Sequence, residues 1–353
     1  MYNRIIKPLL FSLNIEQAHR LVIWILRILG VMPGGHRLLS RCYAVEEPAL
    51  KRDVFGMSFR NPIGLAAGFD RDGEVVEELG ALGFGFVEVG AVTSQPQEGN
   101  PKPRVFRLHK DQAIVNRLGQ PNRGWMCAIE NLRKSYGKGT LIGCNISSNS
   151  FTPSNDSPKE YLKIFRSLYQ YVDYFTVNIA AQSVEADVVA FSDEALRRVV
   201  MPLCDFRRGQ SEYRPILIKL SPDLTDEQID IATDVMIETP LDGIVAVTGT
   251  NHREGLESSD ATITRVGRGR LTGKPLTQRA LEVVKRVYAR TEGAYPIIGV
   301  GGIMSVKDAQ AMFEAGASLI QLYSGFVYEG PKLVKDICKA MVSTPVAKDQ
   351  KEK

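Results

Sequence analysis

From Asn61 onward, short apolar runs alternate along the chain with longer segments in which apolar residues recur at helical spacing. The apolar runs have the length and composition of strands that are buried on both faces. These runs are residues 63–69, 86–93, 141–147, 174–180, 215–221, 243–250, 296–303 and 319–326. Helical periodicity fills residues 72–82, 158–171, 223–237, 276–290 and 305–315 between them. Eight strands that alternate with helices predict the α/β class and a (β/α)8 TIM barrel.

The first part of the chain has a different pattern. Residues 5–31 are apolar on one side, but charged residues interrupt them, so that no run reaches the roughly 20 residues of a membrane-spanning helix. Pro8 and residues 14–16 predict two short helices. The second helix presents a broad apolar surface, made of Ala18, Leu21, Val22, Trp24, Ile25 and Ile28. This surface either packs against the main domain or lies in the membrane interface, and amphipathicity alone favours packing.

These patterns divide the chain into three parts. We expect a small N-terminal helical extension over residues 1–45, the barrel over residues 46–341 and a flexible tail over residues 342–353. A length of 353 residues suits one barrel with a small appendage. We expect Trp24 and Trp125 to anchor packing, and His109 and His252 to be solvated loop residues.

Composition is that of an ordinary globular protein, with 44% hydrophobic and 24% charged residues. The five cysteines are far apart and form no CxxC pair, and the four histidines show no ligand spacing, so we expect neither disulfides nor a metal site. The net charge of +4 is spread along the chain, and we expect no nucleic-acid partner. These features are typical of a reduced cytoplasmic protein.

Glycine and polar residues concentrate where the expected strands end, which is where barrel enzymes gather their functional residues. After the seventh strand Gly301 and Gly302 permit close backbone approach, and after the eighth Ser324 lies in a similar turn. A helix expected to begin near Ser305 adds further N–H groups. Two adjacent turns of this kind favour phosphate binding.

Lys219 ends an apolar strand and is expected to point into the barrel mouth. A lysine in that position either forms an internal salt bridge or places a cation near the N1–C2=O edge of a flavin, where negative charge accumulates on reduction. Asn145 and Asn178 end neighbouring strands and can offer amide hydrogen bonds to the same ring system.

The motifs along the chain resemble those of the class 2 dihydroorotate dehydrogenases. They are NPIGLAAGFDRDGE (61–74), GFGFVEVGAVT (83–93), GNPKPRVFRL (99–108), NRLG (116–119), KLSPDL (219–224), LTGKPL (271–276), PIIGVGGI (296–303) and ASLIQLYSGFVYEGP (317–331), and the likeness runs from residue 1 to about residue 341. The resemblance implies an FMN-dependent oxidoreductase of CH–CH bonds that oxidises dihydroorotate to orotate in pyrimidine biosynthesis. It further implies a quinone acceptor and a monomer bound peripherally to the cytoplasmic face of the inner membrane.

The resemblance also assigns residues by position. For FMN it implies Ala66, Ala67, Gly68, Arg71, Ala91, Asn145, Asn178, Lys219, Val247, Gly273, Gly301, Gly302, Tyr323 and Ser324. For the substrate it implies Arg71, Asn116, Gly119, Gln120, Asn178, Ser183, Thr248 and Gly249, and for the quinone His19, Arg107 and Tyr323. The opening segment is similar to the helical extension that forms the quinone tunnel at the membrane, which reverses the preference for simple packing.

The sequence departs from the family pattern mainly at substrate positions. The fourth strand of the family ends in Asn-x-Ser-(Ser or Cys)-Pro-Asn, and the second Ser or Cys is the catalytic base, whereas this chain has Ala181 there and Ser183 at the final asparagine. Alanine cannot take a proton. The sixth-strand Thr-Asn-Thr becomes residues 247–249, Val-Thr-Gly, and Gly-Phe-Asn-Asn becomes residues 119–122, Gly-Gln-Pro-Asn. Arg71 replaces a lysine, and Ala91 replaces a threonine.

Three functions are compatible with this pattern. We favour an oxidoreductase for a different, still anionic substrate, with Arg71 as a fork for its carboxylate and with Ser183, Thr248, a water or no protein base handling the proton. The second is a genuine but slow dihydroorotate dehydrogenase. The third is a flavin-binding protein without turnover.

Overall fold

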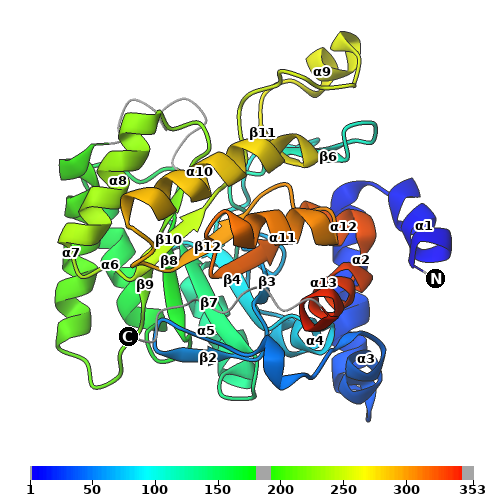
Figure 1. The fold of residues 1–353 in the computed structure, drawn as a ribbon, viewed down its shortest axis with the longest axis horizontal. Helices are drawn as coiled ribbons and strands as arrows, with labels where there is room; N and C mark the ends of the chain where they lie inside the picture. Colours follow the sequence, from blue (N-terminus) through cyan, green and yellow to red (C-terminus); the bar gives the residue numbers. More distant parts are fainter. Residues whose placement is uncertain (1, 180–191, 344–353) are drawn as a thin grey trace.

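The structure is a computed structural model that describes residues 2–179 and 192–343. Within these residues, parallel strands close into a barrel in the order β10-β12-β13-β3-β4-β7-β8-β9 (Figure 1). The strands are β3 (Ile63–Leu65), β4 (Phe86–Val92), β7 (Leu141–Ile146), β8 (Tyr174–Val177), β9 (Ile216–Leu220), β10 (Gly243–Ala246), β12 (Ile297–Val300) and β13 (Leu319–Leu322). The predicted TIM barrel and its eight strands are confirmed. The strands end earlier than predicted, because their last predicted residues form the loops at the barrel mouth.

Helices surround the barrel (Figure 1). They are α4 (Val76–Ala81), α5 (Gly124–Ser135), α6 (Ser157–Leu168), α7 (Asp193–Arg208), α8 (Asp226–Glu238), α10 (Thr277–Arg290), α11 (Val306–Glu314), α12 (Ser324–Glu329) and α13 (Lys332–Ser343). The five predicted helical segments correspond to α4, α6, α8, α10 and α11 and are confirmed, whereas α5, α7, α12 and α13 were missed. Thr225 and Gln228 form a capping box at the start of α8.

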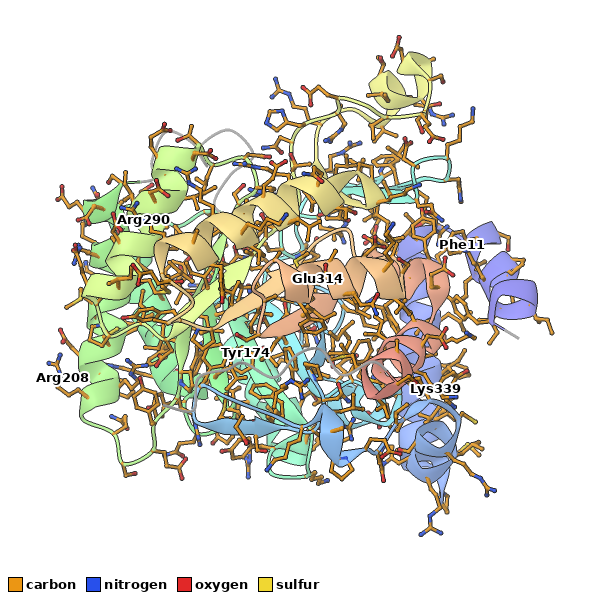
Figure 2. The ribbon with its side chains drawn as sticks, viewed as in Figure 1. Phe11, Tyr174, Arg208, Arg290, Glu314 and Lys339 are labelled. Atoms are coloured by element: carbon orange, nitrogen blue, oxygen red, sulfur yellow. The ribbon has the colours of Figure 1, made fainter. Side chains whose placement is uncertain are left out.

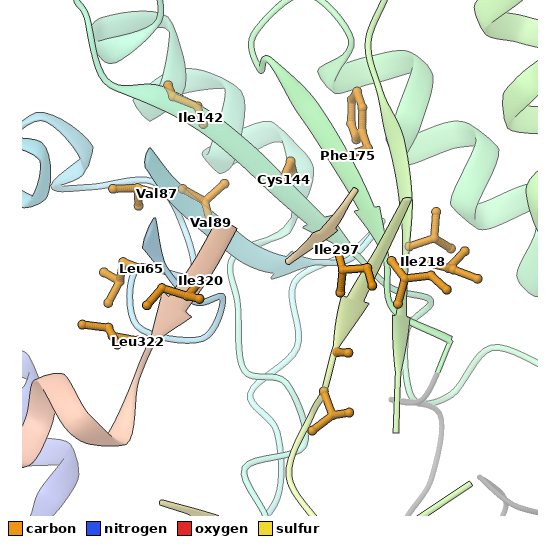
Figure 3. Packing of buried hydrophobic residues seen from close by; sticks show 14 of the residues in the cluster. Leu65, Val87, Val89, Ile142, Cys144, Phe175, Ile218, Ile297, Ile320 and Leu322 are labelled. Atoms are coloured by element: carbon orange, nitrogen blue, oxygen red, sulfur yellow. The ribbon is translucent and has the colours of Figure 1, made fainter. Parts of the chain in front are cut away.

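Side chains alternate along each strand between the barrel interior and the helical layer. Val87, Phe175 and Ile218 belong to the outer core beneath the helices, which Figure 3 shows in part. Their neighbours Phe86 and Leu217 belong to the separate inner cluster. By the same alternation, the residues that follow Val87, Phe175 and Ile218 face the barrel interior, and these are Glu88, Thr176 and Lys219. This arrangement determines which polar residues reach the mouth.

A hairpin of β1 (Arg52–Val54) and β2 (Met57–Phe59) closes the amino end of the barrel. The ring of Phe59 packs edge-on against Phe86, the first residue of β4, with 5.2 Å between ring centroids. Phe59 is fully buried. The interior is therefore filled from below, and access is from the carboxyl end.

A second sheet lies at the carboxyl end of the barrel, with the order β11-β6-β5. Its antiparallel strands are β5 (Val105–Leu108), β6 (Ala113–Asn116) and β11 (Arg270–Gly273), which the sequence pattern did not predict. The segment between β10 and β11 carries helix α9 (Asp260–Val266), which projects from the molecule in Figure 1. Thr272 of β11 lies 2.9 Å, Oγ1 to Oγ, from Ser324, so this sheet contacts the start of α12, just after the last barrel strand.

The N-terminal helices pack beside α4, α12 and α13 (Figure 1). They are η1 (Tyr2–Ile6), α1 (Lys7–Ser12), α2 (Ile15–Val31) and α3 (Gly35–Tyr43), where two helices were predicted. Asn14 caps α2, and Glu16 forms an ion pair with Arg104 at 2.8 Å that ties α2 to the main domain. The expectation that Trp24 anchors packing is wrong, because this side chain is 60% exposed, whereas Trp125 packs partly buried against the core.

No single helix among residues 2–179 and 192–343 is long and apolar enough to cross a bilayer. Helices α2 and α3 pass that test only as a pair, bent by 116°, and only by length and composition.

Candidate functional site

One cavity of about 480 Å³ opens at the carboxyl end of the barrel, a volume within the range of small-molecule sites. It brings together every described residue that the sequence analysis assigned to FMN or the substrate. These are Ala66, Ala67, Gly68, Arg71, Ala91, Asn116, Gly119, Gln120, Asn145, Asn178, Lys219, Val247, Thr248, Gly249, Gly273, Gly301, Gly302, Tyr323 and Ser324. Ala181 and Ser183 lie outside the described residues. The cavity therefore joins the ends of all eight barrel strands.

The floor of the cavity carries a buried ion pair. Lys219 Nζ lies 3.7 Å from Glu88 Oε1, and Glu88 is fully buried in the middle of β4. The internal salt bridge that we weighed against a flavin-facing lysine is thus present. Lys219 also lines the cavity, so the salt bridge does not exclude a role beside a flavin, which stays a prediction. Sequence reasoning missed Glu88. Its signal was a single carboxylate inside the apolar run of residues 86–92, at an inward position of the strand.

An amide chain continues from this pair across the floor. Asn145 donates from Nδ2 to Glu88 at 2.9 Å and accepts at Oδ1 from Asn178 at 3.1 Å. Asn178 Oδ1 and Gln321 Oε1 are buried and have no hydrogen-bond partner among the described residues. Buried acceptors without donors are costly. Two carbonyl oxygens are therefore available here for N–H groups of a bound ring.

Backbone turns after β12 and β13 form another part of the wall. Gly301 and Gly302 have φ of 118° and 69°, a region that favours glycine. The helix that we expected to contribute near Ser305 does not, because α11 is capped by its own residues. Ser305 accepts from the Asp308 N–H at 3.2 Å, Asp308 accepts from the Met304 N–H at 3.0 Å, and none of the three lines the cavity. The backbone that lines this part of the cavity therefore belongs to the turn after β12 and to the first residues of α12.

The opposite wall comes from β11 and from the loop after β6. Arg270 and Arg117 line it, and neither was predicted. Burial lowers the pKa of the Arg270 guanidinium to about 10. Gly249 packs against β11 so closely that a Cβ there would lie 2.9 Å from Thr272 Cγ2 and 3.0 Å from the Leu271 carbonyl oxygen. Among the described residues that line the cavity, four are cations, namely Arg71, Arg117, Lys219 and Arg270, and none is acidic.

His19 and Tyr323 both pack edge-on against Phe69. The Phe69 ring centroid is 5.1 Å from that of His19 and 6.3 Å from that of Tyr323. His19 Nε2 donates to the Phe69 carbonyl at 2.7 Å, and burial together with the Arg71 charge lowers the pKa of His19 to about 4. Burial raises the pKa of Tyr323, and Arg71 opposes that shift. His19 is therefore a neutral donor at physiological pH.

Arg107, the third residue assigned to quinone, is placed differently. Its guanidinium donates to the carbonyls of Leu13 at 2.9 Å and Leu10 at 3.3 Å, and it lies 4.4 Å from the centroid of the Phe11 ring. Phe11 is labelled on the N-terminal extension in Figure 2. Arg107 Nε is buried without a partner among the described residues, and neither Arg107 nor His19 lines the cavity.

Comparison with known proteins agrees with this geometry. Residues 49–344 match the family model for dihydroorotate dehydrogenase. The chain is 42% identical over 337 residues to a dihydroorotate dehydrogenase (quinone) of Christiangramia forsetii, covering 96% of this chain and 97% of that one. It is 40% identical to one of Roseiflexus sp., covering 94% and 91%. Two crystal structures of DHODH from Eimeria tenella, with ferulenol and ligand-free, superpose with a TM-score of 0.83 at 29% and 30% identity, covering 93% of this chain and 90% and 94% of those chains. The chain therefore belongs to the dihydroorotate dehydrogenase family, in its quinone-dependent class, and is a flavin oxidoreductase that acts on a CH–CH bond.

Proposed function

We propose that this chain binds FMN in the cavity at the barrel mouth and oxidises or reduces a carboxylate-bearing substrate other than dihydroorotate. The observation that carries the proposal is the contrast between the two sides of the cavity. By the resemblance in sequence, the floor and the turns after β12 and β13 match the family pattern, whereas Gly249, against which β11 packs, departs from it.

The residues present fit FMN. The acceptors Asn178 Oδ1 and Gln321 Oε1 suit the N–H groups of a flavin ring, and Lys219 suits the carbonyl edge that becomes negative. The turns at Gly302 and Ser324 suit the phosphate. The excess of cationic over acidic lining residues matches a ligand that carries a phosphate and a second ligand that carries a carboxylate.

When bound, FMN supplies the carrier for the hydride that leaves or joins the substrate carbon. The protein orients the substrate and manages its charge. Arg71 holds the carboxylate of the substrate through its planar fork. Asn116 and Asn178 contact the other polar groups of the substrate. Thr248 is a hydroxyl at the cavity wall, and we propose that it, Ser183 or a water exchanges the proton.

The departures from the family pattern support a different substrate. Ala181 stands at the position of the base, and Ser183, Thr248 and Gly249 replace groups that would contact orotate. A site built to hydrogen-bond a substrate loses large factors when such groups are missing. A slow dihydroorotate dehydrogenase is the second candidate, and the hydroxyl of Thr248 in the cavity favours it.

The purified chain is expected to be yellow and to keep about one FMN per chain through desalting. FMN is expected to bind at least about 10²-fold more tightly than riboflavin, since charge-assisted hydrogen bonds contribute roughly 1.5–3 kcal/mol each. Absorbance at the flavin bands and titration of the stripped protein with both compounds measure this. A colourless protein that takes up no FMN contradicts the proposal, and equal affinities contradict the phosphate site.

We also propose that the N-terminal extension rests on the cytoplasmic face of the inner membrane, that the chain works as a monomer, and that quinone reaches it near His19, Arg107 and Tyr323. Large exposed apolar side chains gather on the extension. They are Ile5, Leu9, Trp24, Ile25, Ile28, Val31, Met32 and Leu38. This gathering is unusual for a surface exposed only to water.

The double substitution Trp24→Ser with Leu38→Ser is expected to lower the fraction bound to phosphatidylethanolamine–phosphatidylglycerol vesicles about tenfold or more, because each side chain contributes roughly 1.5–3 kcal/mol on full burial. Co-sedimentation measures it. The matched control is Phe151→Ser with Met126→Ser, two exposed apolar residues away from the extension, which is expected to bind like the wild type. Equal binding of all three proteins contradicts membrane contact through the extension.

A further inference from the structure

We infer that Glu88 is a positioning residue of the redox site, which orients Lys219 and Asn145 and offsets the lysine charge beneath the flavin ring. This inference rests on the proposed FMN site. It extends the site below the residues that line the cavity, since Glu88 itself does not line it.

Glu88 is the centre of the polar network inside the barrel. It is fully buried and accepts hydrogen bonds from Asn145 at 2.9 Å, Gln321 at 2.7 Å, Thr176 at 3.1 Å and Tyr174 at 3.3 Å. These donors come from β7, β13 and β8, and Lys219 adds an ion pair from β9. Figure 2 labels Tyr174, the first residue of β8. One carboxylate therefore links five strands of the barrel, its own included.

The network has an upper and a lower side. Lys219, Asn145 and Gln321 line the cavity, whereas Tyr174 and Thr176 do not. Tyr174 packs within the inner apolar cluster, below the polar layer. On its lower side Glu88 accepts hydrogen bonds from these two hydroxyls. On its upper side it accepts hydrogen bonds from the two amides and pairs with Lys219. Removing it would release the lysine and both amides from their present orientations.

The charge of Glu88 acts in the same place. Lys219 is only 7% exposed, so its charge is weakly screened by water, and the carboxylate 3.7 Å away offsets it. A cation near the carbonyl edge of a flavin stabilises the negative charge of the reduced ring. The pair therefore moderates the stabilisation that Lys219 alone would give.

The test is the two-electron reduction potential of the bound flavin. Glu88→Gln removes the negative charge at nearly constant volume and is expected to favour reduction at least about tenfold in the equilibrium constant, which is a rise of about 30 mV. Lys219→Met is expected to lower the potential, and the double variant to lie between the two single variants. Anaerobic titration against redox dyes measures all four proteins.

The control is Glu160→Gln, which removes another buried carboxylate that accepts from Ser94 and Asn149 outside the network, and it is expected to leave the potential unchanged. If Glu88→Gln does not fold, the difference between Lys219→Met and the double variant still reports the Glu88 charge. One outcome overturns this inference but not the proposed function. In it the wild type binds FMN, yet the potential is the same in the wild type and Glu88→Gln, and the same in Lys219→Met and the double variant. Wild-type protein that binds no FMN overturns the proposed function as well.

Discussion

Dihydroorotate is expected to reduce the flavin of this chain about 10²- to 10⁴-fold more slowly than it reduces the flavin of a quinone-dependent relative with serine or cysteine at the position of Ala181. The methyl group of Ala181 cannot take the proton that leaves as the hydride is transferred. Anaerobic stopped-flow absorbance at the main flavin band gives the rate for both proteins. Equal rates would show that another group in this chain performs the proton transfer.

The single substitution Ala181→Ser is expected to recover less than about tenfold of that loss, since a base contributes fully only when the substrate is held in reach of it. In addition, β11 occupies the space that a side chain at position 249 would need. Full activity in Ala181→Ser would mean that Ser183, Thr248 and Gly249 do not determine the substrate.

The structure also explains why restoring more family residues is not a simple repair. A side chain at position 249 would contact the Leu271 carbonyl at 3.0 Å, and backbone cannot move aside like a flexible side chain. A side chain at position 249 and the observed position of β11 therefore exclude each other.

The barrel strands could be predicted because each is apolar on both faces and is followed by a helix of clear periodicity. The sheet of β5, β6 and β11 could not, because β11 pairs with a strand that is distant in sequence and its residues show no strong alternation. Arg270 was missed for that reason. Its position in the cavity depends on a pairing between Arg270 and Asn116 that no local pattern reveals.

Glu88 was missed for a different reason. Alternation along β4 places it inward, so a sequence argument could have paired it with Lys219, which we also expected inside. The exposure of Trp24, by contrast, could not have been predicted from the sequence. An apolar helix face predicts burial against something, but the sequence does not say whether that is protein or membrane.

Arg71→Ala is expected to lower kcat/KM about 10²-fold or more for any carboxylate substrate that reduces the flavin, because truncating one partner of a buried charge pair costs roughly 2–5 kcal/mol. Arg71 lines the cavity, and its charge acts on both His19 and Tyr323, so it lies between the proposed substrate site and two of the residues proposed for quinone. Arg71→Lys is expected to lose less, since it keeps the charge but not the fork.

The substrate for this test comes from an anaerobic screen. Dihydropyrimidines and 2-hydroxy acids are tested for reduction of the oxidised flavin, and enones for reoxidation of the reduced flavin. The acid and its amide are then compared in both proteins, with bound FMN measured each time. The wild type is expected to prefer the acid strongly and Arg71→Ala to prefer it little, because only the wild type holds a cation that recognises the carboxylate. If the wild type accepts the amide as well as the acid, Arg71 does not recognise the substrate carboxylate. The four cations of the cavity would then serve flavin binding only.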